Sequence, residues 1–175
     1  MSPFYRLKQV WWAVSARPLN SEQQKQIAGL LTPTELELFG RFSTNDQNHS
    51  ARVLTHLILI GEEAPSLLKA ALLHDIGKTR TPLTVVDRSL AVAGKILMTN
   101  QVTTWGMLPL QDARRYHRPF VVKEQHAQWG ADIVAAAGSD PLTVRLIQRH
   151  QDLLIDIASE EDRLLSVLQW ADDLS

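Results

Sequence analysis

Apolar residues recur three, four or seven positions apart along most of the chain, the spacing of one face of an α-helix. Alternation of apolar and polar residues, the spacing of a half-buried strand, is rare. No two alternating runs are joined by a hairpin dipeptide. The pattern therefore predicts an all-α fold.

Capping signals set the bounds of the predicted helices. Thr32, for example, precedes Pro33 and stands three residues before Glu35, which is the spacing of a capping box. We expect helices at about residues 21–31, 32–39, 44–61, 65–77, 122–137, 141–151 and 159–174, with a weaker helical pattern over 85–97. We expect residues 99–119 to form an irregular connection.

The composition is that of a soluble globular protein. The 175 residues are 45% hydrophobic and 21% charged, enough chain for one domain with a sizeable core. The apolar patch Val10–Val14 is shorter than the core of a signal peptide, and no run approaches the length of a membrane span. We therefore expect a cytoplasmic protein without a membrane partner.

Charge and cysteine content narrow the possible partners. The formal net charge is −1, so no global field attracts a nucleic-acid polymer, and we expect none as a partner. Cysteine is absent, which excludes disulfides, thiolate metal sites and a cysteine nucleophile. Any bound metal ion must therefore be held by nitrogen and oxygen atoms.

Four of the six histidines lie on predicted apolar helix faces. Each has apolar residues three, four or seven positions away, the spacing at which side chains share one face of a helix. These histidines are His49, His74, His126 and His150, one on each of four helices. One such histidine alone is usually a hydrogen-bonded core residue, so the interpretation depends on the whole set.

Two aspartates join these histidines. Asp75 follows His74 directly, about 100° further around the helix, so both side chains can reach one point near the helix end. In the last predicted helix Asp172 shares a face with two leucines, whereas Asp173 shares a polar face. We expect Asp172 to point inward and Asp173 to point into water.

The set as a whole predicts a metal site. Burying several imidazoles and two carboxylates without compensation is expensive, because buried charges must be paired or must coordinate a metal. Neutral imidazoles and carboxylates gathered at one place are what a divalent cation needs. We expect one or two divalent transition metal ions, and the ligand types admit iron, manganese, zinc, nickel or cobalt.

These residues, in this order, resemble the HD-domain metal-dependent phosphohydrolase superfamily. Its pattern is an isolated His, a His-Asp pair, one or two further His and a C-terminal Asp. The matching stretches are DQNHSARVLTHL, LLHDIGKT, KEQHAQWGADIV, LIQRHQD and LQWADDLS. The resemblance implies a compact helical bundle of the HD-domain type, with a central metal site, over residues 43–175. Residues 1–42 would form an N-terminal appendage with short helices.

The resemblance also implies roles for these residues. One metal ion would be held by His49, His74, Asp75 and Asp172. A second would be held by His126 and His150, with Asp75 bridging the two. The implied activity is cleavage of a phosphate ester or anhydride, of a nucleotide or dinucleotide, by metal-activated water. The Gly-Tyr-Pro signature of the cyclic-di-GMP phosphodiesterase branch does not follow His126, which disfavours that substrate.

Several cations are candidates for contacts with a phosphate. Lys78, just after the His-Asp pair, is the first, and with Asp75 we assign it a catalytic role. Arg52, one turn after His49, is the second candidate for substrate binding. The arginines of the predicted irregular connection can rim the pocket or face solvent; they are Arg114, Arg115 and Arg118.

Two other functions remain open at this point. Some HD-fold proteins hold two irons and use oxygen to oxidise a small molecule, and their ligand set resembles this one closely. A non-catalytic sensor domain that keeps a metal ion for stability is the third reading. All three bind metal ions, so the ligand pattern alone does not separate them.

Two tryptophans and two histidines lie outside the ligand pattern. Trp11 and Trp12 are adjacent and cannot both face one helix stripe, so one can pack on the bundle while the other meets a second copy in a homodimer. His56 falls seven residues after His49 and is expected to hydrogen-bond near the site. His117 is expected to be exposed.

Overall fold

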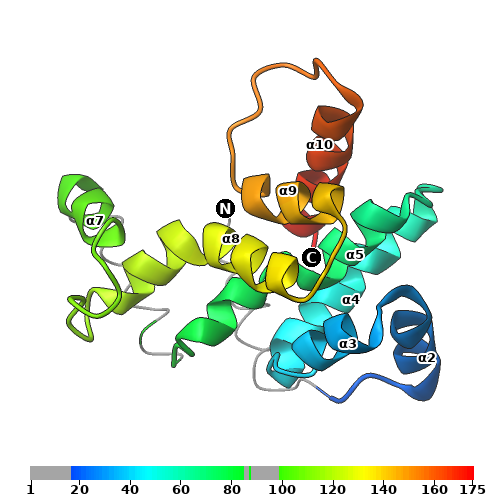
Figure 1. The fold of residues 1–175 in the computed structure, drawn as a ribbon, viewed down its shortest axis with the longest axis horizontal. Coiled ribbons are helices and arrows are strands. Elements are labelled where there is room, and N and C mark those ends of the chain that lie inside the picture. The colour runs from blue at the N-terminus through cyan, green and yellow to red at the C-terminus, as the bar shows by residue number, and fades with distance from the viewer. Residues whose placement is uncertain (1–16, 85–86, 88–98) are drawn as a thin grey trace.

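The computed structural model describes residues 17–84, 87 and 99–175, and its elements there are helices. They are α2 (Ser21–Leu30), α3 (Pro33–Phe39), α4 (Thr44–Leu59), α5 (Pro65–Leu73), the short 3₁₀ helix η1 (Ile76–Arg80), α7 (Thr99–Gly106), α8 (Arg118–Ala136), α9 (Pro141–Arg149) and α10 (Glu160–Asp173) (Figure 1). No strand occurs in the described part of the chain, and the prediction of an all-α fold is confirmed.

Side-chain caps begin several helices where the sequence predicts them. The Thr32 hydroxyl accepts a hydrogen bond from the Glu35 backbone N–H, and the Glu35 carboxylate accepts one from the Thr32 backbone N–H. Asp140 and Ser159 cap the starts of α9 and α10. Gly138, with a φ of 80°, follows the end of α8 in the left-handed conformation that favours glycine.

The prediction of an irregular connection over residues 99–119 was partly wrong. This region contains helix α7, and α8 begins at Arg118 rather than near Val122. Helix α7 packs against the first half of α8, where the rings of Trp105 and Phe120 lie 5.5 Å apart between centroids. Packing of this kind stabilises a short helix whose own signals are weak. Two predictions fall on residues that the structure does not describe. They are the weak helical pattern over 85–97, where only residue 87 is described, and the tryptophan pair at 11–12.

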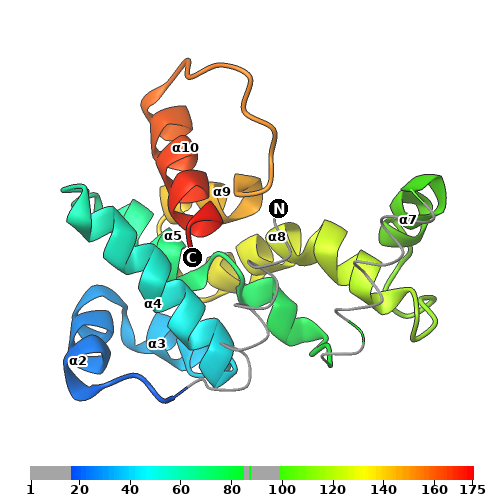
Figure 2. The same ribbon diagram turned by 180° about the vertical axis from the view of Figure 1, so that it is seen from behind.

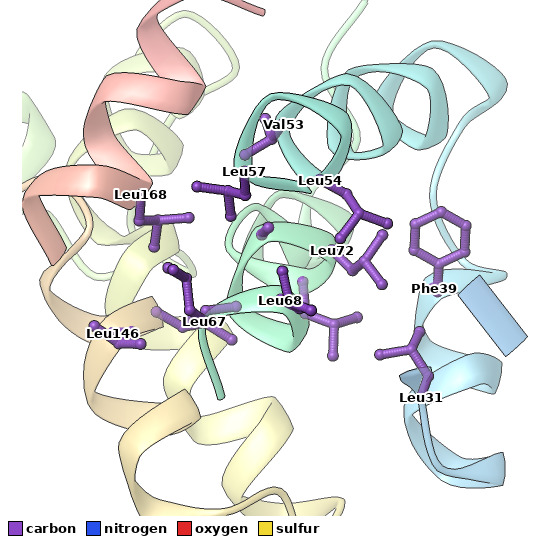
Figure 3. Packing of buried hydrophobic residues seen from close by; sticks show 14 of the residues in the cluster. Leu31, Phe39, Val53, Leu54, Leu57, Leu67, Leu68, Leu72, Leu146 and Leu168 are labelled. Carbon is purple, nitrogen blue, oxygen red and sulfur yellow. The ribbon is translucent and has the colours of Figure 1, made fainter. Parts of the chain in front are cut away.

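The main hydrophobic core lies between α4, α5, α9 and α10, and α2 and α3 pack against its edge (Figure 3). Its centre consists of fully buried aliphatic side chains, among them Val53, Leu57, Leu67, Leu72, Leu146 and Leu168. Burying each such side chain stabilises the fold by about 1.5–3 kcal/mol. A smaller core beneath α8 contains Ala113, Val121, Val122 and Trp129.

Residues 17–42 share the main core with the helices that follow them. Leu31 and Phe39 belong to the same cluster as Leu54 and Leu72 of the central helices (Figure 3). The division of the chain at residue 42 stays a prediction about domain organisation.

A buried carboxylate also joins α3 to the rest of the molecule. Glu35 is fully buried and accepts hydrogen bonds from Lys69 Nζ at 2.8 Å, from Ser139 Oγ at 2.7 Å and from Thr32 N at 2.8 Å. We call these four residues the Glu35 cluster. Burial raises the pKa of Glu35, but the three donors outweigh it and leave that pKa below its usual value.

The helices meet at the centre of the molecule. The C-terminal end of α10 reaches the place where the junction of α5 and η1 lies beside α8 and α9, as both views show (Figures 1 and 2). Helix α7 and the start of α8 form one end of the molecule, away from this centre. None of the described helices combines the length and the apolar character needed to cross a bilayer.

Candidate metal centre

Six side chains from different elements converge at the centre of the molecule. They form two groups, within each of which the candidate ligand atoms lie within 4.8 Å of one another. The first group is His49 of α4, His74 at the end of α5 and Asp172 of α10; the second group is Asp75, His126 of α8 and His150 at the end of α9. The structure thus brings together every candidate ligand that the sequence pattern singled out.

The first group is compact. The Nε2 atom of His49 lies 2.9 Å from Oδ1 of Asp172 and 3.4 Å from Nε2 of His74. The same Asp172 oxygen lies 3.5 Å from His74 Nε2. His74 is fully buried, whereas His49 and Asp172 are partly exposed, so this group lies on the solvent side of the centre.

The second group is fully buried. The Nε2 atoms of His126 and His150 lie 3.2 Å apart, and Asp75 Oδ1 lies 3.2 Å from His126 Nε2 and 3.9 Å from His150 Nε2. All three side chains have less than a tenth of their surface exposed. No charged group here can rely on bulk water for solvation.

Asp75 lies between the two groups. Its Oδ1 atom faces His126 and His150, while its Oδ2 atom lies 3.5 Å from His74 Nε2 and 3.9 Å from His49 Nε2. One carboxylate therefore presents a different oxygen to each group, which is the arrangement expected of a bridging ligand.

Backbone carbonyls hold three of the four imidazoles in one tautomer. In each, Nδ1 donates to a carbonyl one turn earlier in its helix: His74 to Ala71 at 3.1 Å, His126 to Val122 at 2.8 Å and His150 to Ile147 at 2.7 Å. We assign the proton to Nδ1 on the basis of these contacts. In the neutral ring Nε2 then carries a free lone pair, and this lone pair points into the centre.

This tautomer creates a conflict that a cation resolves. The facing Nε2 atoms of His126 and His150 are both acceptors in the neutral state, so neither can donate to the other across 3.2 Å. Two opposed lone pairs beside a carboxylate repel one another. A positive ion between them turns the repulsion into coordination. The donor set, imidazole nitrogens and carboxylate oxygens, fits a divalent transition metal ion.

The charges of the centre favour the same conclusion. Burial raises the pKa of Asp75, but Lys78 and the neighbouring histidines outweigh it and hold that pKa well below its usual range. Burial likewise raises the pKa of Asp172, and His49 and His74 lower it further than burial raises it. Burial, assisted by His74, lowers the pKa of His150 to about 3. At neutral pH the centre therefore contains two carboxylates and a neutral His150.

The pKa of His74 is shifted in the direction opposite to that of His150. Burial lowers the pKa of His74, but the carboxylates of Asp75 and Asp172 outweigh burial and raise it. The same field that favours a proton on this ring favours any other cation next to it. A metal ion would compete with that proton for His74 Nε2.

A close backbone contact sets the position of the His-Asp pair. Helix α5 ends at Leu73, and η1 begins at Ile76, so His74 and Asp75 lie in the turn between them. A Cβ atom on Gly77 would overlap the carbonyl oxygen of His126 and lie 2.7 Å from the backbone nitrogen of Gly130. Gly77 is needed for space, because η1 packs directly on α8.

Two positions that support the centre, Gly130 and Gln169, were not among the predicted site residues. Gly130 of α8 has the Ile147 side chain 3.1 Å, and the Gly77 nitrogen 3.4 Å, from where its Cβ would be. Gln169 Nε2 donates to the backbone carbonyls of His150 at 3.1 Å and Asp152 at 2.8 Å, which ties the end of α9 to α10. Only the spacing WGADI around Gly130 hinted at its role. Gln169 carried no signal.

The candidate substrate-binding cations lie at different distances from the centre. Lys78 Nζ lies 2.5 Å from Asp75 Oδ2, and its side chain is 40% exposed. Arg52 is partly buried on α4, three residues after His49. Arg114 and Arg115 of the connection before α8 are exposed, and so is Arg118, the first residue of α8, which precedes His126 by about two helical turns.

The remaining histidines differ from expectation or lie outside the centre. The ring of His56 packs against that of Trp170 with centroids 6.3 Å apart. His117, expected to be exposed, is only partly exposed, because its ring lies between Trp105 and Tyr116. Asp172 points inward and Asp173 is exposed, as predicted.

Comparison with protein families gives a match. The family model described as HD domain matches residues 47–175, well over half of the chain and all six residues of the centre. Neither a curated protein nor a solved structure matches the chain.

Proposed function

The chain belongs to the HD domain family, whose members are mostly metal-dependent hydrolases, and from this premise we propose that it is a metal-dependent phosphohydrolase. Its substrate would be a phosphate ester or anhydride, and we propose a nucleotide or dinucleotide. The observation that carries the proposal is the position of Asp75 between the two ligand groups, in the second of which the facing Nε2 atoms of His126 and His150 are both acceptors.

The proposed ligands follow from the two groups. One ion would be held by His49, His74, Asp75 and Asp172, and a second by Asp75, His126 and His150. Divalent ions there would supply Lewis acidity, which activates water and stabilises charge on phosphoryl oxygens. The carbonyl contacts to Nδ1 keep the histidine lone pairs directed inward, so the centre does not need to reorganise.

Lys78 is the side chain best placed to contact a phosphate. Asp75 Oδ2 anchors its ammonium group, and its partly exposed side chain leaves donors free to face solvent. We propose that Lys78 binds a phosphoryl oxygen and stabilises the negative charge that grows on it during cleavage. Arg52 is the second candidate for this contact, and it precedes the His-Asp pair in the sequence, whereas Lys78 follows it.

Elemental analysis followed by a substrate screen tests the proposal. The purified protein should contain transition metal, and the metal-replete protein should hydrolyse at least one member of a panel of nucleotides and dinucleoside polyphosphates. His74→Ala should abolish that activity, and Asp173→Asn, a change at an exposed acid near the centre, should not. Equally slow hydrolysis by wild type and His74→Ala across the panel would refute the proposal. Oxygen consumption by the reduced, iron-loaded protein would instead indicate an oxidase.

A further inference from the structure

A second group of side chains with chemical potential lies away from the metal centre. It occupies α7, the following connection and the start of α8, at one end of the molecule (Figures 1 and 2). We call it the arginine–aromatic platform, and it consists of Trp105, Arg114, Arg115, Tyr116, His117 and Arg118. The proposed hydrolase function uses none of these residues.

The aromatic rings of the platform form a contiguous cluster. The rings of Trp105 and His117 are inclined by only 32°, with centroids 5.1 Å apart. Tyr116 meets His117 edge to face at 4.2 Å, and Trp105 rests on the buried Phe120 at 5.5 Å. The cluster is therefore anchored in the protein at Phe120 and open to solvent at Tyr116, which is 47% exposed.

Three arginines lie within two sequence positions of Tyr116. Arg114, Arg115 and Arg118 fall within five residues and all are exposed. Arg114 Nη1 lies 3.4 Å from the hydroxyl oxygen of Tyr116, so one guanidinium is next to the exposed ring. Arg115 lies 3.9 Å from the carboxylate of Asp87 but keeps an 80% exposed side chain. Residues 105–118 contain three arginines and one acidic residue, Asp112, although the whole chain carries a net charge of −1.

We propose that the arginine–aromatic platform binds single-stranded nucleic acid. Unpaired bases stack on exposed aromatic rings, and nearby arginines neutralise the phosphates of successive nucleotides. Sites for small molecules are concave and enclose their ligand, whereas this ring and these guanidinium groups are exposed. Several separated positive charges also suit a strand with several phosphates better than a single nucleotide.

The platform is distinct from the metal centre. Arg118 and His126 lie on the same helix, eight residues or about 12 Å apart along its axis. Composition alone led us to expect no nucleic-acid polymer, because it averages charge over the whole surface. The local gathering of arginine and aromatic side chains is a property of how α7 folds back on α8.

Fluorescence anisotropy with a labelled, phosphorothioate-linked oligonucleotide, which resists hydrolysis, tests this proposal on the full-length protein as purified. With three arginines contacting phosphates, log K should fall with log salt with a slope of about −2, since each contact to a single strand contributes about −0.7. Changing all three arginines to alanine should abolish binding, and Arg41→Ala, a change at an exposed arginine between α3 and α4, should leave it unchanged.

The exposed tyrosine separates stacking from charge. Tyr116→Ala should weaken binding about 5- to 150-fold, the usual loss for one stacked base, with the salt slope unchanged. Tyr116→Phe keeps the ring and should bind like wild type. Far-UV circular dichroism and metal content confirm that each variant is folded.

Three outcomes would overturn the proposal. The first is no binding of the oligonucleotide at low salt. The second is equal binding of inorganic polyphosphate, which has no bases and would reduce the patch to a general anion site. The third is competition by a mononucleotide at the same concentration of nucleotide units, which would indicate a site for free nucleotides. Binding that survives in His74→Ala would support the platform even if hydrolysis is never found.

Discussion

The Glu35 cluster and the metal centre are both buried and both polar, but only one of them is complete. Glu35 has one negative charge and receives an ammonium group, a hydroxyl and a backbone N–H within 2.8 Å. In the metal centre the Nε2 atoms of His126 and His150 face each other at 3.2 Å with no donor between them. The first cluster supplies its own positive charge. In the second the Lys78 ammonium pairs with Asp75 Oδ2, and no positive group of the described residues is shown between His126 and His150.

This difference separates a structural role from a functional one. A satisfied buried network stabilises a unique packing, here of α3 against α5 and the turn before α9. A buried network whose acceptors oppose one another is unstable by itself and persists only if a ligand completes it. The Glu35 cluster should therefore govern folding, and the metal centre should govern activity and metal-dependent stability.

The largest effect is expected at the bridging carboxylate. Asp75→Asn removes the charge shared by both groups, and hydrolysis should fall at least about 100-fold, because even outer-shell partners of a metal contribute about 10- to 100-fold. Steady-state kcat/KM and metal content per chain measure the loss. Asp173→Asn is the matched control and should retain both. Full activity in Asp75→Asn would exclude Asp75 from the site.

Removing the carboxylate of the Glu35 cluster should affect folding alone. Glu35→Ala leaves the largely buried ammonium of Lys69 unpaired and should lower the free energy of unfolding by about 3 kcal/mol. Urea denaturation measures this, with the exposed Glu37→Ala on the same helix as the control. Metal content of the folded protein should not change. Loss of metal in Glu35→Ala would show that the two clusters are not independent.

Metal itself should stabilise the protein by a comparable amount. At a free metal concentration 100 times Kd, a single site adds about 2.7 kcal/mol. For a chain of this length that raises Tm by about 5–11 °C. Differential scanning calorimetry with and without chelator measures the shift. This metal-dependent rise in Tm should persist in Glu35→Ala and disappear in His126→Ala. A wild-type Tm that does not change when chelator is added would contradict metal binding at the centre.

The contact between η1 and α8 can be tested with a pair of glycines. Gly77→Ala forces a methyl group against the His126 backbone and should destabilise the protein by about 1–3 kcal/mol while lowering metal content. Gly29→Ala in α2, where no atom outside the neighbouring helix backbone lies within 4 Å of the new methyl group, should stabilise the protein by about 0.4–1 kcal/mol. Chemical denaturation of both variants gives the sign of each change in the free energy of unfolding. An unchanged free energy of unfolding in Gly77→Ala would contradict the close packing of η1 on α8.

The smallest effect is the pH dependence of the Glu35 cluster. The pKa of Glu35 is lower in the folded state than in the unfolded chain, so its contribution is fully present above the unfolded value near 4.5 and is lost as pH falls through the folded value. The stability difference between wild type and Glu35→Gln should be constant from pH 7 to about 5 and shrink below that. A difference that grows in acid would reverse the assigned shift.

Much of the fold could be predicted because its signals are local. The capping box at Thr32, the cap at Asp140 and the glycine at 138 each act within one turn of chain, so sequence spacing reveals them. Helix α7 could not be predicted in this way, because its stability depends on Trp105 packing against Phe120 of another helix. The same dependence explains why His117 is partly covered rather than exposed.

The identity of the candidate ligands could be predicted from the sequence, but their positions relative to one another could not. Periodicity turned Asp172 inward and Asp173 outward, since both lie on one helix whose axis defines a single set of faces. The supporting roles of Gly77 and Gln169 depend on atoms of other elements, a backbone oxygen of α8 and the carbonyl of His150. No pattern within their own segments carries that information.

The sequence by itself determined the helical class of the protein, the buried faces of its helices and the types of ligand atom available for a metal ion. Only the tertiary structure decided that these atoms form two groups with one carboxylate between them, and that arginines and aromatic rings gather at the far end of α8. The reason is geometric. Residue spacing specifies an angle around one helix axis, whereas the distance between side chains on different helices depends on how those axes cross and how closely their backbones approach.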